Sequence, residues 1–425
     1  LVFERVRAPL SPDQVTETYD YDGNRNVVLI RRGLEADSSP LYVGDASRTT
    51  LYLYDGYDRI LRLTDPMDNV HICEYDAAGN RTRTETQGEP IDAPGDAGNV
   101  RLGEQACDYD GMDRRTECRT EHFDTASQLP IGDGLSTRSC IFNDCSQALS
   151  CTDDNANTTT YTYDTANRCA SATDARGNSR VYAYDPNSNL VQTVETDLSD
   201  LGNPNEVFVT NYVYDAMDRR IRHVDPIGIQ TDSFYDSRDN TTRRIDGRDN
   251  ETRYAYDGVD RMVRIDRDLT DTGDGAGLLI GTATTAYEYD DSSRLVRVED
   301  DNAHATDFAY DALSRLAATT NADATVRLYT YDHHDNLLDS LDPNLTATTY
   351  VYDLLDRRTL TSVFVGPGVS NDTTLETYTY DGLSRVVTAQ DDDTSVTFAY
   401  DSLSNRVSEA QSLNAAPPQF VTFVH

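Results

Sequence analysis

The sequence contains no lysine and no tryptophan, and it has only four methionines and seven cysteines among 425 residues. All 37 basic residues are therefore arginine, and against 74 acidic residues they leave a formal net charge of −37. A chain this acidic lacks the clustered cations that nucleic-acid backbones require, so we expect no nucleic-acid partner. No apolar run approaches the length of a transmembrane helix, so we also expect no membrane span.

Tyrosine is abundant, with 27 copies against 10 phenylalanines. Low hydrophobicity with high net charge is typical of disordered chains, but disordered chains contain few aromatic residues. The tyrosines are explained by an internal repeat, because 25 of them lie in the two aromatic columns of a Tyr-x-Tyr-Asp motif. The second aromatic of this motif occurs 16 times, from Tyr21 to Tyr400, with a base period of 21 residues.

Three columns keep the frame of the repeat. Asp follows the second aromatic in 15 of the 16 units, and the fifth residue after the aromatic is Arg in nine units and Asn in six. The motif is clearest in six units, whose Tyr, Asp and Arg are Tyr54, Asp55 and Arg59; Tyr163, Asp164 and Arg168; Tyr214, Asp215 and Arg219; Tyr256, Asp257 and Arg261; Tyr289, Asp290 and Arg294; and Tyr352, Asp353 and Arg357.

Each unit is predicted to be a β-hairpin. Side chains alternate along a strand, so Tyr-x-Tyr places two rings on one face of a sheet. The fourth residue after the aromatic is Asp, Ser, Asn or Gly in 15 units, as at Asp58 and Gly79, and these residues favour turns. A second strand and a second turn, such as Asp65-Pro66, complete the unit. One hairpin is marginal in water, so the units must stack to be stable.

The best-preserved copy, from Tyr161 through Arg168 to Asn178, resembles the RHS/YD repeat family, and the resemblance covers almost the whole chain. It implies an all-β fold of tandem hairpins that form a spiralling sheet, a hollow shell or an extended scaffold. We expect a lead-in at 1–17, an array of 16 units at 18–410 and a tail at 411–425. Longer spacings predict hairpin insertions near 87–103, 123–134, 197–206, 268–285 and 364–374.

All seven cysteines lie between Cys73 and Cys169. Cys107 and Cys118 occupy the same two columns of their unit as Cys140 and Cys151 occupy in the next, 11 residues apart. These columns face one another across the hairpin, so we predict disulfides Cys107–Cys118 and Cys140–Cys151. The alternative is that free thiols fill a tyrosine position. Cys73, Cys145 and Cys169 receive no role.

The acidic turn that contains Asp268, Asp271 and Asp274 invites a calcium interpretation, because hard cations bind several oxygens from one loop. The alternative is a simple Asp/Gly-rich turn, since the spacing of a complete ligand loop and its closing Glu are missing. No motif of a hydrolase, metalloprotease or nucleotide-binding protein occurs, and the seven histidines are scattered. We therefore predict no enzyme and no cofactor other than this candidate calcium.

The resemblance implies a secreted or cell-surface location, since the family includes polymorphic toxins, shell components of Tc toxins, wall-associated proteins and teneurins. The leading hypothesis is a structural building block of a shell, filament or sheath that self-associates through its sheet edges. The alternatives are an adhesion module for a glycan or a receptor, and an encapsulating segment of a polymorphic toxin. The toxin branch carries an autoproteolytic core, and no matching segment follows Tyr400.

Overall fold

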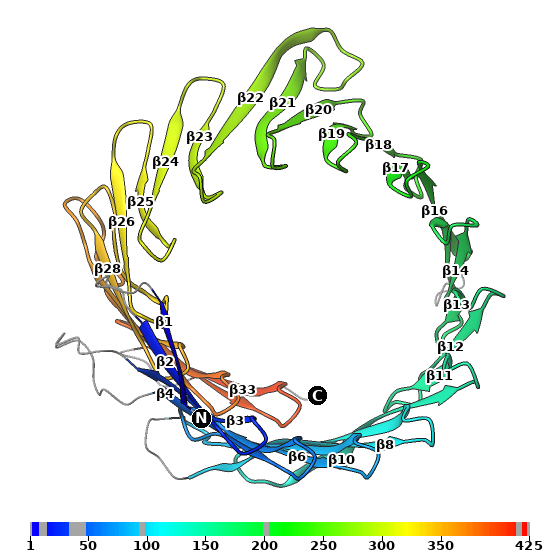
Figure 1. Ribbon diagram of the computed structural model, residues 1–425, viewed down its shortest axis with the longest axis vertical. Helices are drawn as coiled ribbons and strands as arrows, with labels where there is room; N and C mark the ends of the chain where they lie inside the picture. The colour runs from blue at the N-terminus through cyan, green and yellow to red at the C-terminus, as the bar shows by residue number, and fades with distance from the viewer. Residues whose placement is uncertain are drawn as a thin grey trace. The chain divides into compact units, whose positions relative to one another are not determined.

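The computed structural model describes residues 2–7, 15–33, 48–92, 98–198, 204–413 and 419–422. These residues form 34 β-strands, and Figure 1 shows hairpins throughout (Figure 1). The all-β prediction is confirmed. Within the described segments no helix is long and apolar enough to cross a membrane. Two compact units are present: unit 1 comprises Leu1–Arg138, Tyr310–Thr319 and Val326–His425, and unit 2 comprises Ser139–Ala309 and Thr320–Thr325.

Unit 1 contains strands from both halves of the sequence, each paired antiparallel with its neighbour in the chain. Its strands are β1 (Val2–Arg7), β2 (Val15–Tyr21), β3 (Val27–Gly33), β4 (Arg48–Tyr54), β5 (Ile60–Thr64), β6 (Val70–Tyr75), β7 (Arg81–Gly88), β8 (Val100–Tyr109), β9 (Arg115–Phe123), β26 (Val326–Tyr331), β27 (Leu337–Leu341), β28 (Ala347–Tyr352), β29 (Arg358–Phe364), β30 (Leu375–Tyr380), β31 (Val386–Asp391), β32 (Thr394–Tyr400), β33 (Arg406–Leu413) and β34 (Gln419–Thr422).

Unit 2 is a meander of antiparallel hairpins. It contains β11 (Ala148–Thr152), β12 (Thr158–Tyr163), β13 (Cys169–Thr173), β14 (Ser179–Tyr184), β15 (Leu190–Asp197), β16 (Glu206–Tyr214), β17 (Arg220–Val224), β18 (Gln230–Tyr235), β19 (Thr241–Ile245), β20 (Glu251–Tyr256), β21 (Met262–Thr270), β22 (Leu279–Tyr289) and β23 (Leu295–Glu299). Three further strands have residues assigned to both units: β10 (Pro130–Phe142), β24 (Ala305–Tyr310) and β25 (Leu316–Thr320).

The turn after each second aromatic has one geometry. In the Tyr54 unit, the amide of Asp58 donates to the carbonyl of Asp55 at 3.2 Å, and the amide of Asp55 donates to the carbonyl of Arg59 at 2.9 Å. Asp58 has a φ of 60°, and the equivalent residue of all 16 units also lies in the left-handed region. This conformation explains why Asp, Ser, Asn and Gly dominate the column, since they tolerate it best.

The turns between units follow the same pattern with less suitable residues. Gly177 and Gly228 occupy the left-handed position in two of them, but Ala156 and Leu345 occupy it in others with φ of 60° and 66°. A non-glycine residue without a polar side chain is strained there by about 1 kcal/mol. The surrounding ladder hydrogen bonds therefore hold these turns in place.

Little of the sheet is deeply buried. The two rings of Tyr52 and Tyr54 lie on one face with centroids 6.4 Å apart, as the alternation predicts, and both are half-buried. Among the apolar side chains that the structure describes, most of the fully buried ones are in unit 1, including Leu102 and Phe123. Unit 1 therefore holds most of the deeply buried apolar side chains that the structure describes.

Candidate functional site

The aspartate that follows each tyrosine organises its own turn. Asp55 Oδ1 accepts hydrogen bonds from the amides of Tyr57 and Arg59 at 2.8 and 3.1 Å, and Oδ2 accepts from Arg59 Nε at 2.7 Å. The bond from Arg59 holds the pKa of Asp55 below its ordinary value of 3.8. The carboxylate therefore acts as a charged turn anchor, and the same bonds recur at Asp164, Asp215, Asp257, Asp290 and Asp353.

The arginine of the turn also joins one unit to the next. Arg59 Nη1 donates to the backbone carbonyl of Asp76 at 3.0 Å, and its guanidinium lies 4.6 Å from the ring centroid of Tyr75. We call this combination of turn aspartate, arginine and next-unit carbonyl and ring the arginine staple. It recurs at Arg168, Arg219, Arg261, Arg315, Arg357 and Arg385.

Asparagine replaces this staple with a shorter one. Asn80 Nδ2 donates to Asp76 Oδ2 within its own turn and to Asp113 Oδ1 of the next unit, at 3.0 and 2.8 Å. Asn26, Asn189, Asn240 and Asn336 do the same. In the sequence, every Asn of this column that is followed by another unit has Asp at the left-handed position of that unit, whereas Arg is mostly followed by Ser. A single column does not reveal this pairing, which appears only when adjacent units are compared.

The second tyrosine supplies another bond between units. Tyr256 Oη donates to the carbonyl of Thr241 at 3.0 Å, and Tyr54 Oη donates to that of Val27 at 2.9 Å. Each acceptor is the sixth residue after the second aromatic of the preceding unit, and at least ten more tyrosines repeat the contact. The phenol oxygens therefore bind the preceding hairpin, a bond that phenylalanine could not make.

The structure links Cys107 to Cys118 and Cys140 to Cys151 by disulfides. Each pair lies directly opposite in its hairpin, with Cα atoms 4.2 and 4.1 Å apart. The remaining thiols are free, and Cys73 occupies the same column as Cys107 and Cys140 but faces Thr84. In this hairpin, Cys73 therefore stands at one of the two disulfide positions and Thr84 stands at the other.

The calcium candidates do not converge. Asp268 lies on β21 and pairs with both Nη atoms of Arg253, at 2.9 and 2.6 Å. Asp271 accepts the amide of Leu278, and Asp274 accepts the hydroxyl of Thr272. Across the described ranges no group of three acidic, His or Cys side chains could hold a metal ion. Asp271 and Asp274 thus bond within the hairpin turn, while Asp268 pairs with an arginine of the neighbouring strand.

Two late turns, which follow β30 and β32, dock on two early insertions, and all four segments belong to unit 1. The amide of Gly382 donates to the carbonyl of Glu89 at 2.9 Å, and the amide of Asp92 donates to the carbonyl of Tyr380 at 2.7 Å. Asp92 Oδ2 also accepts from Arg357 Nη2 at 2.9 Å. We call this contact, together with the equivalent contact one unit later, the seam.

The second half of the seam repeats the arrangement one unit later. The amide of Ser402 donates to the carbonyl of Phe123 at 2.9 Å, and the Ser402 hydroxyl accepts from the amide of Phe123 at 2.8 Å. His122 Nε2 lies 3.0 Å from Asp401 Oδ2. Phe123 is 2% exposed and Asp401 is completely buried. The first two predicted insertions therefore bind the chain's own last turns.

Comparison with known proteins supports the repeat assignment. The sequence model of the RHS repeat matches residues 289–326, which begin at the Tyr289 unit. A search of curated proteins finds no match. The crystal structure of TcdB2-TccC3 aligns with 93% of this chain and 30% of its own, at 13% identity and a TM-score of 0.33. The Photorhabdus luminescens Tc holotoxin pore aligns with 93% and 32%, at 12% identity and a TM-score of 0.31.

This chain spans about a third of the length of those structures. The low TM-scores add nothing to the assignment, which depends on the repeat model and on the unit itself. The segment matched by the repeat model contains the Tyr-x-Tyr-Asp turn, the arginine column and the inter-unit tyrosine bond that recur along the array. Residues 289–326 therefore form an RHS (YD) repeat, and the contacts of that segment recur in the other units of the array.

Proposed function

We propose that this chain is a non-catalytic structural scaffold, secreted or displayed at a cell surface, whose repeats form the wall of a shell. The observation that carries the proposal is the arginine staple. In seven units it uses the repeated Asp and Arg side chains, at the same atoms, to join one hairpin to the next, as Arg168 joins Asp164 to Asp185. The repeated columns thus contribute to cohesion of the sheet, and none of them converges on a reaction centre.

The seam favours the shell over the filament or sheath. A filament grows when the ends of a sheet remain free to pair with other copies. Here two early insertions are held by turns from the last repeats, through buried groups such as Phe123 and Asp401. Early and late repeats that hold each other leave fewer free groups for end-to-end growth.

The disulfides supply the argument for location. Cys107–Cys118 and Cys140–Cys151 each close a hairpin, and disulfides persist mainly in oxidising compartments. The encapsulating part of a polymorphic toxin is one form that such a secreted shell takes.

Negative-stain electron microscopy of the purified chain tests the proposal. Closed particles of uniform size are expected, and a variant with both seam turns weakened, Gly382→Ala with Ser402→Ala, should give open or associated particles. Long filaments of the unmodified chain would contradict the shell. Peptide mass spectrometry without reduction tests the compartment, since seven free thiols would remove the argument for secretion.

An adhesion module is the second candidate, because one insertion has an apolar tip. Leu278, Leu279 and Ile280 are 73%, 57% and 66% exposed at the end of the β21–β22 hairpin. Exposed apolar clusters of this kind often mark contact sites. Deletion of residues 272–280 should abolish binding to a glycan array or to cells if this candidate is correct, and should leave particle shape unchanged.

A further inference from the structure

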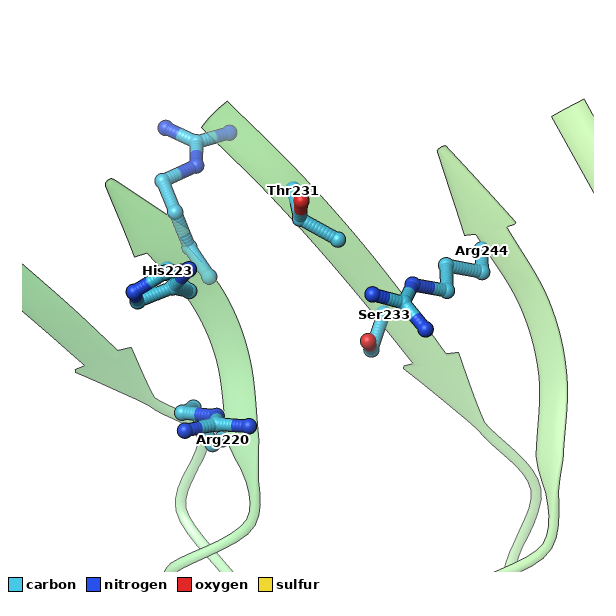
Figure 2. Close-up of a pocket in the computed structure, with 6 residues that line it drawn as sticks. Arg220, His223, Thr231, Ser233 and Arg244 are labelled. Carbon is cyan, nitrogen blue, oxygen red and sulfur yellow. The ribbon is translucent and has the colours of Figure 1, made fainter. Parts of the chain in front are cut away.

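A small cavity of about 130 Å³ lies in unit 2, on the face of strands β17, β18 and β19. Figure 2 shows side chains of these three neighbouring strands gathered around it (Figure 2). Its lining consists of Arg220, Arg222, His223, Thr231, Ser233 and Arg244. No carboxylate lines the cavity, although acidic residues outnumber arginine twofold in this chain.

The arginines of the cavity differ in their partners. Arg222 is neutralised by Asp232 through bonds of 2.7 and 3.1 Å. Arg220 and Arg244 are exposed, and among the described residues neither has a carboxylate within ion-pair distance. Most other arginines of unit 2 do have one, as Arg243 has Glu251. The cavity therefore holds two positive charges that the protein does not compensate.

Hydrogen-bond donors surround these two charges. Thr231 lies directly opposite His223, and Ser233 lies directly opposite Arg244, so all four side chains belong to one face of the sheet. The His223 ring stacks on Tyr212 with centroids 5.4 Å apart, which fixes its orientation. Guanidinium, hydroxyl and imidazole N–H groups together suit a compact anion with several acceptor oxygens.

The geometry points to a binding site for a phosphate or sulfate monoester. Such a group carries tetrahedral oxygens and up to two negative charges, which matches two free guanidinium groups and the two hydroxyls between them. The cavity accommodates one such group but not a polymer backbone. The net charge of −37 also repels long polyanions, so the ligand is a small ester and not a nucleic acid.

The site extends along the sheet in one direction. Arg244 lies opposite Thr252, which in turn lies opposite Arg267, another exposed arginine on the same face without a carboxylate partner in the described ranges. Arg244 and Arg267 are separated by two strand spacings, about 10 Å. A ligand with a second anionic group, such as a sulfated oligosaccharide, reaches both arginines.

Isothermal titration calorimetry of the whole chain tests the site, with inorganic phosphate, glucose 6-phosphate and a disulfated disaccharide as probes. Arg220→Gln and Arg244→Gln should each weaken binding of every probe by about tenfold, the loss of one charge-assisted hydrogen bond. The matched control is Arg248→Gln, which removes an exposed arginine of the following turn and should leave affinity unchanged. Equal unfolding midpoints in urea will show that the variants remain folded.

Two results would overturn the inference. One is that no probe gives a heat of binding at low salt. The other is that Arg248→Gln weakens binding as much as Arg220→Gln and Arg244→Gln do, because the probes would then respond only to the net charge of the protein. Tighter binding of glucose 6-phosphate than of inorganic phosphate identifies a saccharide ester as the source, and equal binding identifies the free anion. Arg267→Gln should weaken only the disulfated probe, and an equal loss for inorganic phosphate would refute the extension.

Discussion

The ion pair between Arg357 and Asp92 provides the sharpest test of the seam. The Arg357 side chain is 8% exposed and the Asp92 side chain is fully buried. Arg357 also makes the ordinary staple, to Asp353 Oδ2 at 2.5 Å and to the carbonyl of Asp381 at 3.0 Å. Replacing it by alanine therefore removes both the staple and the seam contact.

Arg261 is a matched control. It makes the same staple to Asp257 and Asp290, at 2.7 and 3.0 Å, and its guanidinium lies 4.9 Å from the next tyrosine ring, the distance also seen for Arg357. It has no counterpart of the Asp92 contact. The difference between Arg261→Ala and Arg357→Ala thus isolates the seam.

Arg261→Ala and Arg357→Ala should lower the free energy of unfolding by clearly different amounts. Loss of a partly exposed staple removes hydrogen bonds of modest net value, about 1–2 kcal/mol. Arg357→Ala also removes the cationic partner of the buried Asp92, whose Oδ1 already has no partner and whose Oδ2 keeps only the amide of Asn69. Breaking a buried ion pair costs about 3–5 kcal/mol. Arg357→Ala with Asp92→Asn should recover part of this loss, because the unpaired charge is then absent.

Native-state hydrogen exchange is the appropriate assay, since repeat arrays open locally before they unfold globally. The reporter amides are those of Asp92 and Gly382, which donate across the seam. Their protection should fall in Arg357→Ala and stay unchanged in Arg261→Ala. Equal protection in both variants would refute the claim that the ion pair holds the seam.

The stability lost in Arg357→Ala should also depend on pH. Burial raises the pKa of Asp92 above its ordinary value of 3.8, so the folded state disfavours its charged form. For such a group, stability is lost as pH rises through the folded pKa and regained as pH falls. The cost of Arg357→Ala should therefore be smaller in mildly acidic buffer than at neutral pH.

Three further predictions follow from particular residues. Gly382→Ala should open the seam, because the added Cβ would lie 2.6 Å from the backbone of the opposing segment. Gly258→Ala changes the same column but its Cβ meets nothing within 4 Å, so only Gly382→Ala should speed hydrogen exchange at the seam. Thr84→Cys should form a third cross-strand disulfide with Cys73 and lower the number of free thiols from three to two by thiol titration. The lowered pKa of Asp55 and its equivalents means that their stabilisation is complete above pH 3.8 and is lost as the pH falls through the folded pKa, so circular dichroism should show unfolding only below pH 3.8.

The hairpin unit was predictable because its determinants are local. The left-handed residue of each turn lies where the sequence places Asp, Ser, Asn or Gly, as at Asp58, and the paired columns of Cys107 and Cys118 lie opposite each other. The relation between Asn80 and Asp113 was also present in the sequence, but only a comparison of adjacent units reveals it. Local periodicity thus accounts for the units and for the contacts between neighbours.

The seam was not predictable on the same grounds. The turns that contain Gly382 and Ser402 have the ordinary sequence of the repeat, and their partners lie almost 300 residues earlier. The spacing predicts the insertion near 87–103 but gives it no partner, whereas in the structure its start binds the chain itself. Contacts of this kind depend on the accumulated geometry of many hairpins, which no single repeat encodes.

The arginine staple also gives a partial physical reason for the absence of lysine. In the Arg168 unit, Nε and Nη2 bind one carboxylate, Nη1 binds the next unit's carbonyl, and the plane of the guanidinium lies against the Tyr184 ring at 4.6 Å. A lysine ammonium has one nitrogen and no plane, so it could not make these three contacts together. That requirement holds for the seven arginines shown to make the staple, and elsewhere in the array asparagine joins neighbouring units with a different geometry. Of the 37 arginines, 28 lie outside this column and share no such constraint, so selection for the staple cannot by itself have removed lysine from the whole chain.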